Sequence, residues 1–184
     1  ETGKTLAYTI SVLPLALAED RKVVISTATT ALQDQVLVKD LPELSKNSDL
    51  NFSYALAKGR GRYICLSKLD QQLEGMNADQ SSLPLFLIEQ NAALSDQATL
   101  ETYLTSYASG SWDGDRDSWG KIIEPEVWRS LSTDNQQCSN RRCSYFSSCP
   151  YYEARKQWED ADVVVANHDL VLSDLALGGG VILP

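Results

Sequence analysis

The stretch Lys22-Val23-Val24-Ile25-Ser26 (KVVIS) is a short, β-branched run with polar residues on both sides. Such a run is typical of a strand in a parallel sheet, which is buried on both faces. Asp162–Ala166 (DVVVA) has the same character, and Phe52–Leu56 is a further candidate strand. Helical spacing of apolar residues covers Thr5–Ala18 and Thr29–Lys39, and the second of these begins at a threonine that can cap a helix. The order of helix, strand and helix predicts part of an α/β sheet domain.

The middle of the chain has a different pattern. Leu66–Ser109 carries apolar residues at helical spacing, and we expect this region to be all-helical. A Gly/Asp/Ser-rich loop is expected at Gly110–Gly120, followed by at most a short helix at Glu126–Leu131. Tyr151–Asp160 has the pattern of one polar helix. Since α/β patterns stand on both sides of this mostly helical part, the sequence predicts an insertion into a sheet domain.

Length and composition suit one ordinary globular domain, or a domain with a small insertion. The chain has 184 residues, of which 43% are hydrophobic. It contains no run of about 18 apolar residues, and its first residues do not resemble a secretory signal. We therefore expect a cytoplasmic protein that makes no membrane contact.

The net charge of −9 has the wrong sign for a domain that holds nucleic acid by its overall charge. Any contact with DNA must therefore use a local patch of cations. Basic residues do gather around the cysteines: Lys58, Arg60, Arg62 and Lys68 near the first, and Arg141, Arg142, Arg155 and Lys156 near the other three. The alternative is that these cations are scattered and solvated, since a basic cluster alone does not establish nucleic-acid binding.

The four cysteines have the spacing of metal ligands. Cys65 stands alone, and Cys138-x4-Cys143-x5-Cys149 follows with Pro150 directly after it. Thiolates suit iron–sulfur clusters and zinc, but zinc usually takes two tight C-x2–4-C pairs, and a proline after the last cysteine recurs in ferredoxin-like ligation. The spacing favours a cluster and leaves open zinc, a disulfide or unliganded thiols.

The residues before the first cysteine carry a more specific signal. Residues 58–65 (KGRGRYIC) resemble the K-G-R-x-N-Y-x-C entry to the cluster in iron–sulfur helicases of the DinG and XPD type, in superfamily two. Arg62 stands where many members carry asparagine. Together with the downstream C-x4-C-x5-C-P, the resemblance implies that Cys65, Cys138, Cys143 and Cys149 hold one [4Fe–4S] cluster.

The resemblance extends to both ends of the chain. Gly3, Lys4 and Thr5 look like the end of a P-loop, whose lysine reaches the β/γ-phosphates of ATP and whose hydroxyl binds Mg²⁺. Residues 26–35 resemble the next helicase motif, and residues 161–168 (ADVVVANH) resemble the strand that follows the cluster domain in DinG-type members. Glu1 departs from the pattern, because the family usually has glycine there.

The likeness implies an N-terminal fragment of a longer ATP-dependent DNA helicase that moves 5′ to 3′ on single strands and acts in DNA repair. It implies a partial RecA-like domain at residues 1–57 and 161–184, interrupted by a cluster insertion at 58–160 that acts as a structural wedge. Cofactors would be the [4Fe–4S] cluster, ATP and Mg²⁺, and the partner would be single-stranded DNA. The carboxylate box lies beyond the chain end, so no catalytic residue is expected here and the fragment alone should be inactive. The alternative is a zinc-stabilised, non-catalytic DNA-binding or interaction module.

Lys58, Arg60, Arg62 and Tyr63 are the candidate DNA contacts, because a wedge must hold phosphates where it splits a duplex. Aromatic residues near the cations could stack bases or pack over the cluster, and packing is favoured for two that lie between cysteines, Tyr145 and Phe146.

Two further features have ordinary explanations. Residues 113–124 imitate a calcium loop, but Ser118 replaces the glycine of its sharp turn, so an acidic solvated loop fits better. His168, the only histidine, follows a buried strand, and we expect it to make a structural hydrogen bond.

Overall fold

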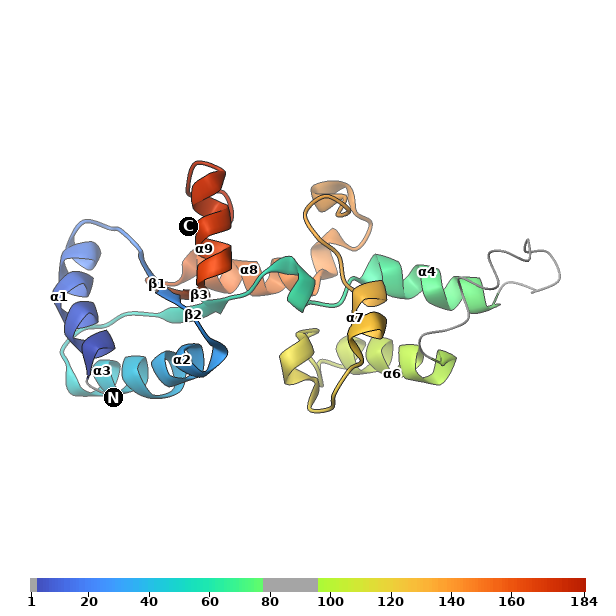
Figure 1. Cartoon of the computed structure of the whole chain (residues 1–184), viewed down its shortest axis with the longest axis horizontal. Helices are drawn as coiled ribbons and strands as arrows, with labels where there is room; N and C mark the ends of the chain where they lie inside the picture. The colour runs from blue at the N-terminus through green and yellow to red at the C-terminus, as the bar shows by residue number, and fades with distance from the viewer. Residues whose placement is uncertain (1–2, 78–95) are drawn as a thin grey trace. The chain divides into compact units, whose positions relative to one another are not determined.

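The computed structural model describes residues 3–77 and 96–184 (Figure 1). It divides into two compact units, one made of Glu1–Lys58 with Ala154–Pro184 and the other of Gly59–Glu153. The first unit is α/β with a small parallel sheet, and the second is mostly helical. The predicted α/β class is confirmed.

The first unit is built on a three-stranded parallel sheet in the order β1-β3-β2. The strands are β1 (Val23–Thr27), β2 (Tyr54–Ala57) and β3 (Val163–Asn167). Strand β3 lies in the centre, with Val163 beside Val23 on one side and beside Tyr54 on the other. Its first four residues are buried, as expected for a β-branched run with neighbours on both edges. A strand from the end of the chain thus completes a sheet begun more than a hundred residues earlier.

Helices surround this sheet. Helix α1 (Lys4–Ala18) precedes β1, and α9 (His168–Ala176) follows β3. The single helix predicted at residues 29–39 is wrong in detail: α2 ends at Gln35, a π-helical turn occupies Val36–Asp40, and α3 (Leu41–Asn47) continues. The predicted cap is present, because the Thr29 hydroxyl accepts a hydrogen bond from the Leu32 backbone N–H at 3.3 Å. The core of this unit consists of Leu13, Ile25, Val36, Leu41, Leu44, Phe52, Val163 and Val165.

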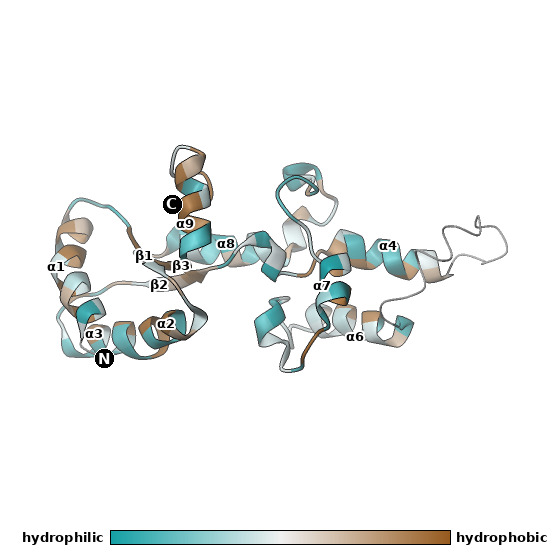
Figure 2. Ribbon diagram, in the orientation of Figure 1, coloured by the Kyte–Doolittle hydropathy of each residue, from teal (hydrophilic) through white to brown (hydrophobic). Residues whose placement is uncertain are grey.

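In the described part of the second unit, the α-helices that form its core are α4 (Leu66–Asn77), α6 (Gln97–Ala108) and α7 (Pro125–Leu131). The two ends of the predicted helical stretch are confirmed, and its centre at residues 78–95 lies outside the described residues. Figure 2 shows hydrophobic and hydrophilic residues alternating along α4, consistent with a helix that buries one face. Buried residues of this core are Ile64, Leu66, Leu69, Leu73, Leu100, Tyr103, Trp112, Ile123, Val127, Trp128 and Leu131.

The segment predicted as a loop at residues 110–120 is more than a solvent loop. It contains a 3₁₀ turn at Arg116–Trp119, and its Trp112 is only 4% exposed. The rings of Trp112, Trp119 and Tyr103 have centroids 4.7–5.7 Å apart. Two tryptophans in a polar sequence therefore anchor this loop to the core.

The first turn of helix α8 (Pro150–Asp160) belongs to the second unit, and the rest of the helix, from Ala154, belongs to the first unit. It is the predicted polar helix, with one more residue at its start. In the part of the chain that the structure describes, no helix is long and apolar enough to cross a membrane.

Candidate functional site

All four cysteines line one partly open pocket of the second unit. Cys65 stands at the start of α4, where its N–H donates to the Leu131 carbonyl at 2.7 Å. The other three lie on a loop with 3₁₀ turns at Asn140–Arg142 and Phe146–Ser148. The structure thus places side chains that are 73 residues apart in sequence around the same pocket, and their role as metal ligands stays a prediction.

Polar contacts attach the cysteine loop to the helices beneath it. The Lys68 ammonium donates to the Ser132 carbonyl at 2.6 Å, and the Tyr145 hydroxyl donates to the Asp70 carboxylate at 2.6 Å. The Tyr107 hydroxyl of α6 donates to the Ser148 carbonyl at 2.7 Å. Because Lys68 and Asp70 both belong to α4, the helix that follows Cys65 also orients the loop that carries the other cysteines.

Cys138 has the most polar surroundings. Its sulfur accepts a hydrogen bond from Arg60 Nη1 at 2.6 Å and another from the Asn140 backbone N–H at 3.3 Å. A guanidinium and an amide N–H are hydrogen-bond donors suited to a sulfur that carries negative charge, as a metal-bound cysteine sulfur does.

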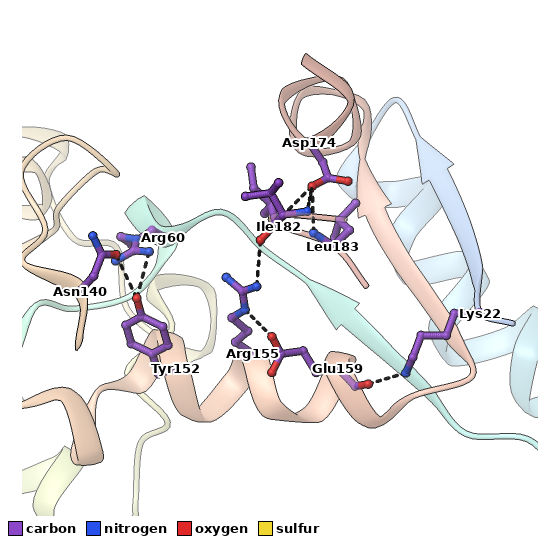
Figure 3. A network of polar contacts seen from close by, with 10 residues as sticks. Lys22, Arg60, Asn140, Tyr152, Arg155, Glu159, Asp174, Ile182 and Leu183 are labelled. Atoms are coloured by element: carbon purple, nitrogen blue, oxygen red, sulfur yellow. Dashed lines mark hydrogen bonds and ion pairs between the residues drawn. The ribbon is translucent and has the colours of Figure 1, made fainter. Parts of the chain in front are cut away.

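Aromatic rings hold the Arg60 guanidinium in place. Its central carbon lies 4.4 Å from the Tyr151 ring centroid and 5.3 Å from that of Tyr152. Arg60 Nη2 also donates to the Tyr152 hydroxyl, which itself donates to Asn140 Oδ1 at 3.0 Å (Figure 3). Both tyrosines belong to the first turn of α8, directly after Cys149 and Pro150.

Cys149 lies deeper in the protein. Burial raises the pKa of its thiol, while the backbone N–H groups of Tyr152 and Tyr151 act in the opposite direction. A half-buried thiol that is hard to ionise by itself needs a positive partner to become a thiolate, and a bound metal group would be such a partner.

The pocket offers four soft sulfur donors, of the kind that suit iron–sulfur clusters and zinc. All four cysteines are free, half-buried thiols, and no other residue type in the pocket offers comparably soft ligands. Among residues 3–77 and 96–184, the structure shows no group of three or more His, Cys, Asp or Glu side chains that could hold a metal ion as they stand.

The candidate DNA contacts occupy different environments. Arg60 is directed into the cysteine pocket, and Arg62 pairs with Asp117. Tyr63 is 5% exposed and packs its ring against Tyr151, with centroids 5.9 Å apart. Lys58 belongs to the first unit. Packing is also observed for the two aromatics between cysteines. Tyr145 packs against the helical core, and the ring centroids of Phe146 and Tyr152 lie 4.4 Å apart.

Sequence reasoning gave too little weight to two residues here. Asn140 was not singled out, although its φ of +52° turns the backbone beside Cys138. Tyr152 was grouped with other aromatics, although its hydroxyl joins Arg60 to Asn140. A signal for Asn140 exists in the sequence, because asparagine is enriched at positive φ and lies two residues after a ligand.

The nucleotide-binding candidates stand at the start of α1. Gly3 has a φ of +50° and precedes the helix, and Lys4 and Thr5 form its first turn. A helix of this length presents backbone N–H groups at its N-terminus, which is a favourable place for phosphate. The role of Gly3, Lys4 and Thr5 in nucleotide binding stays a prediction.

Two ordinary features have different outcomes: the structural hydrogen bond expected of His168 is confirmed, whereas the acidic loop is not fully solvated, because Asp115 is buried. The His168 ring contacts the Ser26 hydroxyl, with Nδ1 and Oγ 2.6 Å apart, which is a structural hydrogen bond between α9 and β1. In the acidic loop, Asp113 accepts from the Asp115 N–H and the Ser118 hydroxyl, and Asp115 accepts from the Asp117 N–H. These carboxylates serve turns within the loop.

Comparison with known proteins identifies close relatives. No family model matches the chain. ATP-dependent DNA helicase DinG of Photobacterium profundum is 42% identical over 182 residues, which is 99% of this chain and 26% of the relative. The DinG proteins of Escherichia coli K12 and Salmonella typhimurium are each 40% identical over 188 residues, with 25% of each relative covered.

The sequence matches a segment of a DinG-type helicase. The resemblance read from the cysteine entry and the terminal motifs is thereby confirmed, and it covers nearly the whole chain. The chain spans about a quarter of the length of the curated DinG relatives that it matches.

Proposed function

We propose that the full-length protein containing this chain is an ATP-dependent DNA helicase that moves 5′ to 3′ along single-stranded DNA. The observation that carries the proposal is the gathering of Cys65, Cys138, Cys143 and Cys149 around one pocket, in a chain whose relatives are named DinG helicases. A role in DNA repair, in the cytoplasm, follows from the same resemblance.

Residues 1–57 and 161–184 are assigned to a RecA-like ATPase domain. The parallel sheet supports this assignment, because β3 returns to pair between β1 and β2 as a strand of one continuous domain would. Gly3, Lys4 and Thr5 would hold the phosphates of ATP and Mg²⁺ at the start of α1. The carboxylates that complete phosphoryl transfer would come from the rest of the protein.

Residues 58–160 are assigned to an iron–sulfur domain. The four thiols would ligate one [4Fe–4S] cluster, which supplies four rigid cross-links between the start of α4 and the cysteine loop. Arg60 and Asn140 stabilise charge on Cys138, and the contacts from α4 and α6 position the loop. This rigidity is what a wedge at a junction of duplex and single strand needs.

Single-stranded DNA is the proposed partner, held by phosphate contacts. Lys58 and Arg62 remain candidates, whereas the contacts of Arg60 and Tyr63 direct them inward. The exposed Arg141 and Arg142, on the turn before Cys143, are better presented to a phosphate backbone. We therefore include both arginines in the proposed DNA contact.

The test uses the full-length protein, loaded with iron and handled without oxygen. We expect ATP-dependent unwinding of a duplex with a 5′ single-stranded overhang. Lys4→Ala should abolish ATP hydrolysis and unwinding, because the lysine would neutralise the transferred phosphate. Lys46→Ala, which removes an exposed lysine of α3, is the matched control and should behave as wild type. Unwinding that persists in Lys4→Ala would contradict the proposed ATP site.

A further inference from the structure

We propose that Arg60 and Tyr152 are positioning residues that raise the reduction potential of the metal group bound by the four cysteines, by acting on the sulfur of Cys138. The inference rests on the proposed cluster. It assigns Arg60 to the metal pocket, although its place in the KGRGRYIC segment suggests a DNA contact.

The contacts of Arg60 all point into the second unit. One terminal nitrogen donates to Cys138 Sγ at 2.6 Å, and the other donates to the Tyr152 hydroxyl at 3.4 Å. The guanidinium face lies over the Tyr151 ring, at 4.4 Å from its centroid. Cation–π contact and hydrogen bonds together restrict a long side chain that would otherwise sample many rotamers.

The contacts form a closed ring around Cys138. Tyr152 receives a hydrogen bond from Arg60 and donates one to Asn140 Oδ1 at 3.0 Å. Asn140 in turn donates its backbone N–H to Cys138 Sγ, and its side-chain amide donates to the Cys138 carbonyl at 3.0 Å. The Tyr152 hydroxyl therefore contacts both residues that donate to the sulfur, Arg60 and Asn140, and Figure 3 shows these two contacts.

Reduction by one electron adds negative charge to an iron–sulfur group, and part of that charge resides on the cysteine sulfurs. A cationic donor at hydrogen-bond distance stabilises the reduced state more than the oxidised state. Hydrogen bonds to the sulfurs and net charge are among the factors that set cluster potentials. Arg60 supplies both factors at a single sulfur, so its removal should make the group harder to reduce.

The experiment is an anaerobic redox titration of the iron-loaded, full-length protein with dithionite, followed by visible absorbance and electron paramagnetic resonance. Four variants are compared with wild type: Arg60→Gln, Arg60→Lys, Tyr152→Phe and Arg142→Gln. The last is the matched control. It removes the same charge from an exposed position next to Cys143, without a hydrogen bond to a cysteine sulfur in the described contacts.

We expect Arg60→Gln to shift the midpoint potential to a more negative value, and Tyr152→Phe to shift it in the same direction by less. Arg60→Lys should recover part of the shift, because lysine keeps the charge and loses the fork geometry. Arg142→Gln should shift the potential least. Equal shifts in Arg60→Gln and Arg142→Gln would overturn the proposal, since bulk charge would then explain both.

Failure of this inference is distinguishable from failure of the proposed function. A wild-type protein that binds zinc and is colourless would contradict the cluster itself. A wild-type protein with a full cluster, whose potential is unchanged in Tyr152→Phe and Arg60→Gln, would contradict only the role of Arg60 and Tyr152. If Arg60→Gln does not retain iron, Tyr152→Phe decides, because it removes one hydroxyl and keeps the ring.

Discussion

Gly114 shows how tightly the cysteine loop is fitted at the scale of single residues. Its φ is +81°, and a Cβ placed on it would lie 2.6 Å from Cβ of Pro150, the residue after Cys149. The Gly114 carbonyl also accepts a hydrogen bond, 2.9 Å long, from the backbone N–H of Ile64, the residue before Cys65. One glycine therefore sets the distance between segments that carry two of the four cysteines.

We predict that Gly114→Ala lowers the melting temperature and the iron content of the full-length protein. The added methyl must displace a proline ring, which costs about 1–3 kcal/mol as overpacking, in addition to about 1–2 kcal/mol for the left-handed backbone. Gly120→Ala is the matched control, because Gly120 has a φ of +75° and open space around its Cβ position. Equal losses in the two variants would show that the contact with Pro150 is unimportant.

Residue types and spacing were sufficient to expect a structural hydrogen bond at His168. The four cysteines, predicted as one set, all line one pocket, and that they bind one metal group stays a prediction. Residue types and spacing were insufficient for Arg60. The direction of its side chain depends on Tyr151 and Tyr152, which α8 brings from about ninety residues away. A basic residue beside a ligand cysteine can turn toward the metal pocket or toward solvent, and sequence spacing does not distinguish the two.

At the scale of elements, the cysteine loop differs from the helices that support it. In the stretch from Ser132 to Cys149, which the structure describes completely, no residue is buried. The helical core of α4, α6 and α7 has eleven buried residues and does not include the cysteines. The loop therefore depends on its polar contacts and, if the proposed metal group binds, on that group, whereas the helices have a hydrophobic core of their own.

We predict that removal of the metal group from the full-length protein unfolds residues 132–149 and leaves α4 and α7 folded. Hydrogen exchange of the metal-free and metal-loaded forms should differ most in this loop, because its backbone loses its cross-links to Cys65. The sheet unit serves as the internal reference. Equally fast exchange throughout α4 and α7 would contradict the division between a metal-dependent loop and a metal-independent core.

Asp174 holds the segment after α9 to the helix. Its carboxylate accepts hydrogen bonds from the backbone N–H groups of Gly180, Val181, Ile182 and Leu183, at 2.6–3.3 Å (Figure 3). Burial alone would raise the pKa of this carboxyl, but the four donors outweigh it and lower the pKa. The ionised form is therefore favoured in the folded protein.

We predict that Asp174→Asn lowers the melting temperature at pH 7, because charge-assisted hydrogen bonds are lost, at about 1.5–3 kcal/mol for a bond to a charged group. Because the folded-state pKa lies below the unfolded value, the stabilisation is present above the ordinary carboxyl pKa of about 3.9 and is lost as the pH falls through the folded value. The difference in melting temperature between wild type and Asp174→Asn should thus become smaller as the pH is lowered. Asp169→Asn, on the exposed face of the same helix, is the control, and an equal effect there would contradict the role of Asp174.

The existence of the elements was easier to predict than their limits. Strands β1 and β3 each lie one residue later than expected, whereas the π-helical turn at Val36–Asp40 interrupts a helix whose apolar spacing gave no warning. A π turn adds a residue within an otherwise regular pattern, so spacing alone does not reveal it. Trp112 and Trp119 likewise stabilise a segment whose glycines and aspartates indicated an exposed loop.

At the scale of the whole molecule, the sequence predicted that a helical segment with cysteines interrupts a sheet domain. The sheet shows the interruption directly, since β3 follows the helical unit and pairs with both earlier strands. Its central place was not predicted, because the order of parallel strands depends on the crossovers and not on the β-branched runs. The assignments to ATPase and iron–sulfur domains remain proposals that depend on what the cysteines bind.

The most direct test is therefore the metal content of the full-length protein, purified without oxygen. We predict about four iron and four sulfide per chain and a brown colour, because four thiolates around one pocket match a single [4Fe–4S] cluster. Replacing any one of Cys65, Cys138, Cys143 or Cys149 by serine should reduce the iron content. A colourless wild-type protein with one zinc per chain would contradict the central claim.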